Sequence, residues 1–176
     1  MNKHLAARMW RQAMSNHIAN GRLIVWVTLF FGVMFQIMPL PSLVELWRPD
    51  WLLMVIMYWA MALPHRYSIL TAWFLGVVLD ILLGAHLGIR AMAFSLVTYI
   101  VVLHFQRLRH FPRWQQSIVI AAFICLYHLV VFWLEFIVVG GVQFKTEYLQ
   151  PVVSSIFIWW WVFWVLRNIR RSYKVR

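Results

Sequence analysis

Three ionisable side chains, Asp80, His128 and Glu135, interrupt long apolar runs of this sequence, and Arg90 follows the first of them closely. A carboxylate and a guanidinium in an apolar setting can form a charge-assisted pair, and paired acids can also relay protons. Inside a membrane a charged group costs about 2.5–3.5 kcal/mol on insertion scales, so it must face protein or water. These four residues are therefore the candidate functional residues.

Three roles for these groups stay open. They can hold helices together, they can bind a partner's transmembrane helix or a lipid headgroup, or they can relay protons or catalyse a reaction. The sequence contains no HExxH, GxSxG, CxxC, P-loop or GxGxxG pattern. Its single cysteine, Cys125, has no partner for a disulfide or a thiolate metal site. We therefore expect no catalytic residue, no metal, no cofactor and no enzyme activity.

A row of small residues surrounds the first carboxylate, because Ala72, Gly76, Asp80, Gly84 and Gly88 recur at every fourth position. In a helix such a row lies along one inclined ridge, where small side chains let another helix approach closely. This is the small-xxx-small packing typical of membrane helices. We expect the alanine and the three glycines to form a helix-packing stripe, with the carboxylate turned toward protein.

The composition indicates the elements that must position these residues. Of 176 residues, 64% are hydrophobic and only five are acidic, and the mean hydropathy is +0.75. This excludes a soluble multidomain protein and predicts one integral membrane domain. The net charge of +11 comes from residues that flank the apolar runs, so it indicates orientation in a membrane and not nucleic-acid binding.

The apolar runs predict an all-α, six-helix transmembrane bundle. The expected spans are about 23–38, 51–63, 68–84, 89–105, 117–139 and 152–168. The second run rises only about 20 Å, less than the bilayer core of about 30 Å. It can start at Pro49 and continue, kinked, through Pro64, or it can be a re-entrant segment.

The first run ends at Pro39 and Pro41, which stop a helix. No small-x-small cleavage motif precedes Pro39, so we expect a retained anchor and not a signal peptide. The run carries a second four-residue row, Thr28, Gly32 and Gln36.

Basic residues decide between crossing and re-entry for the second run. With six crossings, thirteen of the sixteen Lys and Arg residues lie on one side, and only Arg48, Arg90 and Lys145 lie on the other. This split follows the positive-inside rule and places both termini in the cytoplasm. Asp80, Arg90 and Glu135 then share a layer near the periplasmic face, where both carboxylates are expected to pair with the one guanidinium. His128 lies roughly 10 Å deeper.

We expect three segments along the chain. Residues 1–21 are a basic cytoplasmic N-terminal segment, residues 22–168 are the six-span membrane domain, and residues 169–176 are a basic cytoplasmic tail. The first segment fits either an interfacial amphipathic helix or a basic tail that precedes the first span. Both interpretations place it on the cytoplasmic surface.

Short motifs in a fixed order carry a resemblance to a known family. They are Gln36-Ile37-Met38-Pro39, Arg48-Pro49-Asp50-Trp51, Ala62-Leu63-Pro64-His65-Arg66, Leu79-Asp80, Leu87-Gly88, Arg90, Trp114-Gln115-Gln116, Phe132-Trp133 and Glu135-Phe136. With these motifs the chain resembles MreD, the rod shape-determining membrane protein family of bacteria. His128 departs from the family pattern, in which an acidic residue is expected, so the resemblance implies no shared role for it.

The resemblance implies a non-enzymatic subunit of the cell-elongation machinery in the bacterial inner membrane. It implies MreC as the direct partner, with MreB, RodZ, and RodA with its penicillin-binding transpeptidase in the wider complex. It also implies a fold similar to the substrate-binding subunits of energy-coupling-factor transporters. We expect a scaffold that binds MreC and helps position peptidoglycan synthases; homo-oligomer formation stays open. The alternative is a small-molecule or lipid-binding membrane transport subunit.

Overall fold

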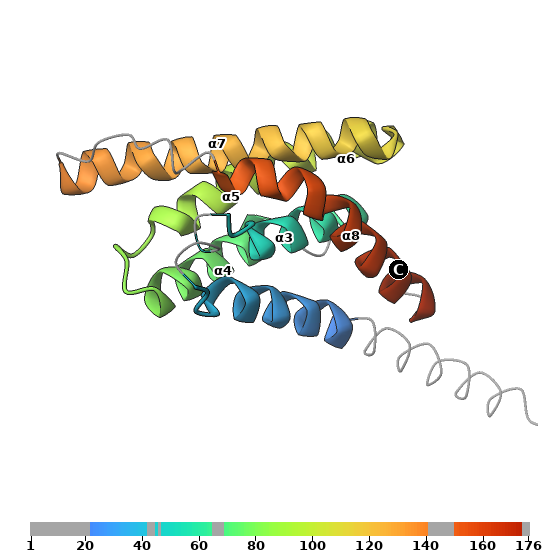
Figure 1. Cartoon of the computed structure of the whole chain (residues 1–176), viewed down its shortest axis with the longest axis horizontal. Coiled ribbons are helices and arrows are strands. Elements are labelled where there is room, and N and C mark those ends of the chain that lie inside the picture. Colours follow the sequence, from blue (N-terminus) through green and yellow to red (C-terminus); the bar gives the residue numbers. More distant parts are fainter. Residues whose placement is uncertain (1–21, 42–44, 46, 65–68, 141–149, 174–176) are drawn as a thin grey trace, which may run out of the picture.

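The computed structural model describes residues 22–41, 45, 47–64, 69–140 and 150–173. Within these ranges every regular element is a helix (Figure 1), which confirms the predicted all-α class. The predicted basic segment 1–21 and Lys145 lie outside the described residues.

The helices occupy the predicted apolar runs, except for α6, which lies in the basic stretch between the fourth and fifth predicted spans. They are Arg22–Ile37, α3 (Trp51–Ala62), α4 (Ile69–Leu82), α5 (Ile89–Leu103), α6 (Phe105–His110), α7 (Arg113–Val139) and α8 (Gln150–Ser172). By length and composition α7 and α8 can cross a membrane, whereas Arg22–Ile37, α3, α4 and α5 are shorter apolar helices. Helix α8 continues four residues beyond the predicted end at residue 168, so the predicted tail begins inside a helix.

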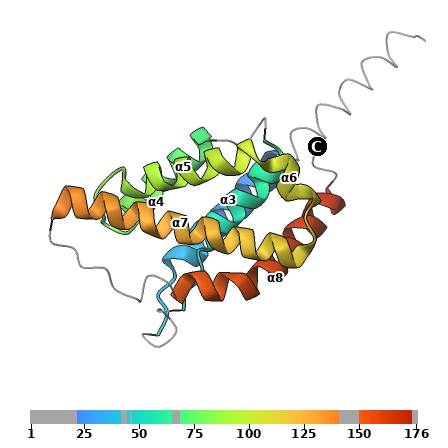
Figure 2. The same ribbon diagram turned by 90° about the horizontal axis from the view of Figure 1, so that it is seen from above.

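Helix α3 lies at the centre of the molecule, between the first helix on one side and α7 and α8 on the other (Figures 1 and 2). Ten consecutive residues, from Leu52 to Met61, are buried. A helix that is apolar on all sides is typical of a protein interior. The expected kinked continuation through Pro64 is wrong, because α3 ends at Ala62. A residue that precedes proline is pushed out of the helical conformation, and this accounts for the stop.

The row Thr28, Gly32 and Gln36 packs the first helix against α3. The Trp59 indole N–H donates a hydrogen bond to the Thr28 hydroxyl at 2.9 Å, and the Leu52 backbone N–H lies 3.5 Å from the Gln36 side-chain oxygen. Between them, a Cβ on Gly32 would lie 3.4 Å from the Leu52 Cα. The two helices are therefore in close contact along this row, although the spacing at Gly32 would also accept a methyl group in ordinary van der Waals contact.

Helices α4 and α5 form a tight hairpin at the other predicted row. A Cβ on Gly76 would lie 2.4 Å from the Ala91 Cα, so only glycine fits at this position of α4. Ala72, one turn earlier, is fully buried. The expectation that Gly84 and Gly88 continue the stripe is wrong. Helix α4 ends at Leu82, and both glycines lie in the following turn.

The two turn glycines have a conformational role in place of a packing role. Their φ angles are +61° at Gly84 and +97° at Gly88, and a Cβ on either would contact nothing within 4 Å. Glycine adopts positive φ without the steric cost that other residues incur. The two residues therefore let the chain reverse between α4 and α5.

Candidate functional site

A polar cavity of about 390 Å³ lies where several helix ends meet. We call it the carboxylate cavity. Its lining residues are Gln36, Glu45, Arg48, Asp50, Leu83, Arg90, Tyr127, His128, Val131, Glu135 and Pro151. These residues come from the C-terminal ends of the first helix and α4, the N-terminal ends of α3, α5 and α8, the connection before α3, and the middle and C-terminal half of α7. Successive long helices therefore run toward and away from the carboxylate cavity in turn.

Asp80 fastens the start of α5 to the end of α4. Its side chain is fully buried, and one carboxylate oxygen accepts a hydrogen bond from the Gly88 backbone N–H at 2.9 Å. The other oxygen lies 3.3 Å from an Arg90 guanidinium nitrogen and 3.4 Å from the Arg90 backbone nitrogen. A carboxylate at a helix N-terminus also interacts favourably with the helix dipole. The charge of Asp80 is therefore compensated in three ways.

His128 pairs with Asp50, a residue that the sequence did not single out as a candidate. The His128 Nε2 lies 2.8 Å from an Asp50 carboxylate oxygen, and Asp50 is 6% exposed. Asp50 stands at the N-cap of α3, where a carboxylate usually accepts a backbone N–H, yet its side chain makes no cap bond. Its carboxylate instead links α3 to α7. The signal available in the sequence was an acidic residue directly at the start of a predicted span.

Arg48 closes the end of the first helix. Its guanidinium donates hydrogen bonds to the backbone carbonyls of Gln36 at 2.8 Å and Met38 at 2.7 Å, and it lies 3.6 Å from the Glu45 carboxylate. Terminal helix carbonyls lack intrahelical partners and carry partial negative charge, so a cation there is stabilising. The sequence analysis placed Arg48 among the few basic residues on its side and in one of the motifs of the family resemblance, but predicted no contact for it.

Glu135 lines the cavity together with Arg90, but the expected pairing of two carboxylates with one guanidinium is not seen. Arg90 forms its ion pair with Asp80, and Glu135 makes no ion pair within the ranges that the structure describes. Glu135 is half-buried. Arg90, His128 and Glu135 therefore line one cavity, and Asp80 contacts Arg90 beside it. The position of this group near the periplasmic face stays a prediction.

The ion pairs at this cavity connect separate helices. The Asp80–Arg90 pair connects α4 to α5. The Asp50–His128 pair connects the N-cap of α3 to the middle of α7. Among the described residues, no group of three or more His, Cys, Asp or Glu side chains could hold a metal ion. The geometry supports a role in positioning the helices relative to one another, since most of the ionisable side chains have partners within the protein.

Two helices are long and apolar enough to cross a membrane, and the other long helices are apolar. Charged side chains line a cavity between the helices. These are the features of a small helical membrane protein. A family model described as rod shape-determining protein MreD matches residues 17–169. A curated relative, the rod shape-determining protein MreD of Haemophilus influenzae, is 31% identical over 157 residues, which cover 87% of this chain and 96% of the relative. The chain therefore belongs to the MreD family. No solved structure matches it.

Family membership connects the chain with rod shape determination. The family is a membrane protein family named for shape determination, and it is not a known enzyme family. The expected likeness to energy-coupling-factor transporter subunits stays a prediction.

Proposed function

We propose that this chain is a non-enzymatic membrane scaffold subunit that binds MreC and helps position peptidoglycan synthases during cell elongation. The observation that carries this proposal is the buried Asp80, which fixes the α4–α5 hairpin through Gly88 and Arg90. The hairpin presents large apolar side chains outward, with Trp73 48% exposed and Leu96 43% exposed. A rigid hairpin with apolar outer faces is suited to hold a partner's transmembrane helix.

The proposal includes six membrane crossings in the bacterial inner membrane, with both termini in the cytoplasm. The alternating direction of successive long helices through the layer of the carboxylate cavity supports this topology. So does the excess of basic residues at the other helix ends. An alkaline phosphatase fusion after Glu147 is expected to be active, and one after Arg109 inactive. The reverse pattern would rule out this topology.

MreC is the direct partner in this proposal, and MreB, RodZ, and RodA with its transpeptidase associate through the wider complex. Little of the described chain lies outside helices, so contacts are made mainly through helix faces and short turns. Membrane lipids occupy the remaining faces. Self-association into a homo-oligomer is compatible with the same surfaces.

Co-purification with co-expressed MreC tests the scaffold proposal. Wild type, Asp80→Ala and Asp80→Asn are compared in mild detergent, with Glu135→Gln as a control that removes a charge from the same cavity without breaking a described ion pair. We expect Asp80→Ala to lose MreC, Asp80→Asn to retain part of it, and Glu135→Gln to retain most. Thermal unfolding of each variant separates loss of the partner from loss of the fold. Full MreC recovery with a folded Asp80→Ala protein would refute the proposed role of Asp80 in MreC binding.

The second candidate function is a small-molecule or lipid-binding membrane transport subunit. The carboxylate cavity favours it, because about 390 Å³ with charged and polar walls falls within the range of small-molecule sites. Native mass spectrometry of the purified chain tests this alternative. A defined small molecule bound to wild type in the absence of any partner would place it first.

A further inference from the structure

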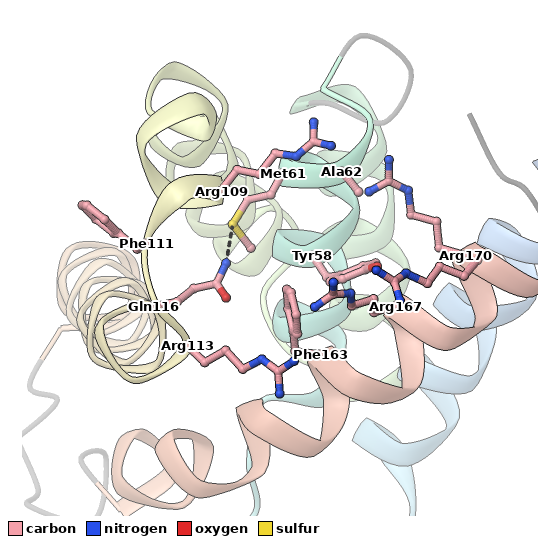
Figure 3. Close-up of a pocket in the computed structure, with 11 residues that line it drawn as sticks. Tyr58, Met61, Ala62, Arg109, Phe111, Arg113, Gln116, Phe163, Arg167 and Arg170 are labelled. Carbon is pink, nitrogen blue, oxygen red and sulfur yellow. Dashed lines mark hydrogen bonds between the residues drawn. The ribbon is translucent and has the colours of Figure 1, made fainter.

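Figure 3 shows a second cavity, of about 540 Å³. Its lining residues lie at the opposite helix ends from those of the carboxylate cavity. Five arginines line it: Arg109 from α6, Arg113 from the first turn of α7, and Arg167, Arg170 and Arg171 from the last turns of α8. We call it the arginine cavity. Figure 3 shows the side chains of Arg113 and Arg167 extending from different helices toward Tyr58 and Phe163.

No acidic side chain of the described ranges balances this charge. Glu45, Asp50 and Glu135 line the carboxylate cavity, and Asp80 binds Arg90 beside it. Arg170 lies within hydrogen-bonding reach of the Tyr58 hydroxyl, which is a neutral partner. Like charges held around one cavity repel each other and attract an anion. The arginine cavity therefore has the charge that an anion-binding site requires.

The lining selects the kind of anion. An arginine guanidinium stays charged and presents a planar fork of donors that matches phosphate oxygens in bidentate geometry. The cavity volume of about 540 Å³ lies within the range of ligand sites and exceeds what a single inorganic phosphate fills. Phe163 and Met61 add apolar wall beside the arginines. A molecule that carries both phosphate and apolar groups fits this mixed lining.

We propose that the arginine cavity binds phosphate groups, supplied by the headgroup of an acidic phospholipid. In the topology proposed above, these helix ends lie at the cytoplasmic face, where basic pockets between helices attract anionic headgroups. The same five guanidinium groups also fit a soluble phosphate, so the experiment includes both sources. Binding here is separate from the contact with MreC, because it uses the opposite helix ends from Asp80 and Arg90.

The test is a thermal-unfolding titration of the full chain in neutral detergent. The probes are a short-chain phosphatidylglycerol, the matching zwitterionic phosphatidylcholine, inorganic phosphate and, at equal ionic strength, chloride. We expect phosphatidylglycerol to raise the unfolding temperature of wild type and phosphatidylcholine to leave it unchanged, because only the first carries uncompensated negative charge.

The decisive variants remove two exposed arginines each. Arg113→Gln with Arg171→Gln removes charge from the arginine cavity, and both side chains are exposed, so the fold is expected to persist. Arg22→Gln with Arg107→Gln removes the same charge from two exposed residues that do not line the cavity. Basic residues near acidic lipid contribute about 1 kcal/mol each, so we expect the first pair to weaken binding about 25-fold and the second pair only slightly.

Each outcome assigns or overturns the site. Stabilisation by phosphatidylglycerol that the first pair abolishes and the second retains supports a lipid headgroup in the arginine cavity. Stabilisation by inorganic phosphate as strong as by phosphatidylglycerol, with the same variant pattern, assigns the site to a soluble phosphate. If neither probe exceeds chloride, or if both variant pairs lose binding equally, the proposal is overturned.

Discussion

The two cavities at opposite helix ends treat charge in opposite ways. In the carboxylate cavity, Asp80 contacts Arg90 and Asp50 lies within hydrogen-bond distance of His128, so both carboxylates have partners within the fold. In the arginine cavity, five guanidinium groups line the space, and none of the described acidic residues lies among them. Removing one member of a buried pair leaves the other uncompensated, whereas removing one of several like charges relieves repulsion. The contacts of the carboxylate cavity therefore stabilise the fold. The like charges of the arginine cavity do not, and they are stabilised only when an anion binds there.

The largest effect is expected from Asp80→Ala. The change leaves the Arg90 guanidinium and the Gly88 backbone N–H without their carboxylate, and breaking a buried pair in this way costs about 3–5 kcal/mol. The free energy of unfolding, measured by denaturant titration in mixed micelles, is expected to fall by about this amount. Glu135→Gln is the control, and equal losses in both variants would contradict the difference between paired and unpaired carboxylates.

A somewhat smaller effect is expected from Gly76→Ala, which tests the helix contact that supports the carboxylate cavity. The new Cβ would lie 2.4 Å from the Ala91 Cα, so the backbone of α5 must move, at a cost of about 2–3 kcal/mol. Gly32→Ala is the matched control, because its Cβ would meet nothing closer than 3.4 Å. The same titration should show little change for the control.

His128→Ala is expected to cost about 1–2 kcal/mol. Asp50 is 6% exposed and would lose its 2.8 Å partner, which leaves a buried acceptor unsatisfied. His110→Ala, at an exposed position of α6, is expected to change the unfolding free energy very little. A negligible effect of His128→Ala would show that water replaces the imidazole. The Asp50–His128 contact would then contribute nothing to the stability of the fold.

The smallest effect is expected at the arginine cavity. Without added lipid, Arg113→Gln combined with Arg171→Gln is expected to change stability by no more than about 0.5 kcal/mol, with a slight gain at low salt that disappears as salt screens the repulsion. Unfolding in neutral detergent at two ionic strengths measures this. A large loss would place the arginine cavity in the framework as well and remove the contrast between the two cavities.

The positions of most helices could be predicted because each one coincides with an apolar run that proline, glycine or basic residues interrupt. The prolines at 39 and 41 follow the first helix, which ends at Ile37, and the predicted start at residue 89 matches the start of α5. Helix α6 was not predicted, because its residues are largely basic and polar. The length of the packing stripe was not predictable. A four-residue row of small residues has the same spacing whether it continues along a helix or enters a turn, and the positive φ of Gly84 is a property of the folded chain.

The carboxylate cavity was predictable in part. Asp80, Arg90, His128 and Glu135 stood out because charge inside an apolar run is costly. The partners of these groups depend on which helices are neighbours, and spacing within one helix does not supply that information. Asp50 was missed for this reason, since its carboxylate pairs across 78 positions of the sequence.

The central position of α3 has a consequence for how the chain is made. The ring of Tyr58 in α3 packs against the ring of Phe163 in α8, with 5.6 Å between their centroids, so the cover of α3 is completed only when synthesis reaches the last helix. At typical elongation rates of about 5–20 residues per second, roughly 100 residues take about 5–20 s. During this interval a short, wholly apolar segment lacks its final neighbour. We expect biogenesis of this chain to depend on a membrane insertase that shelters α3, and ribosome-bound chains that end before α8 to be preferred substrates for membrane quality-control proteases.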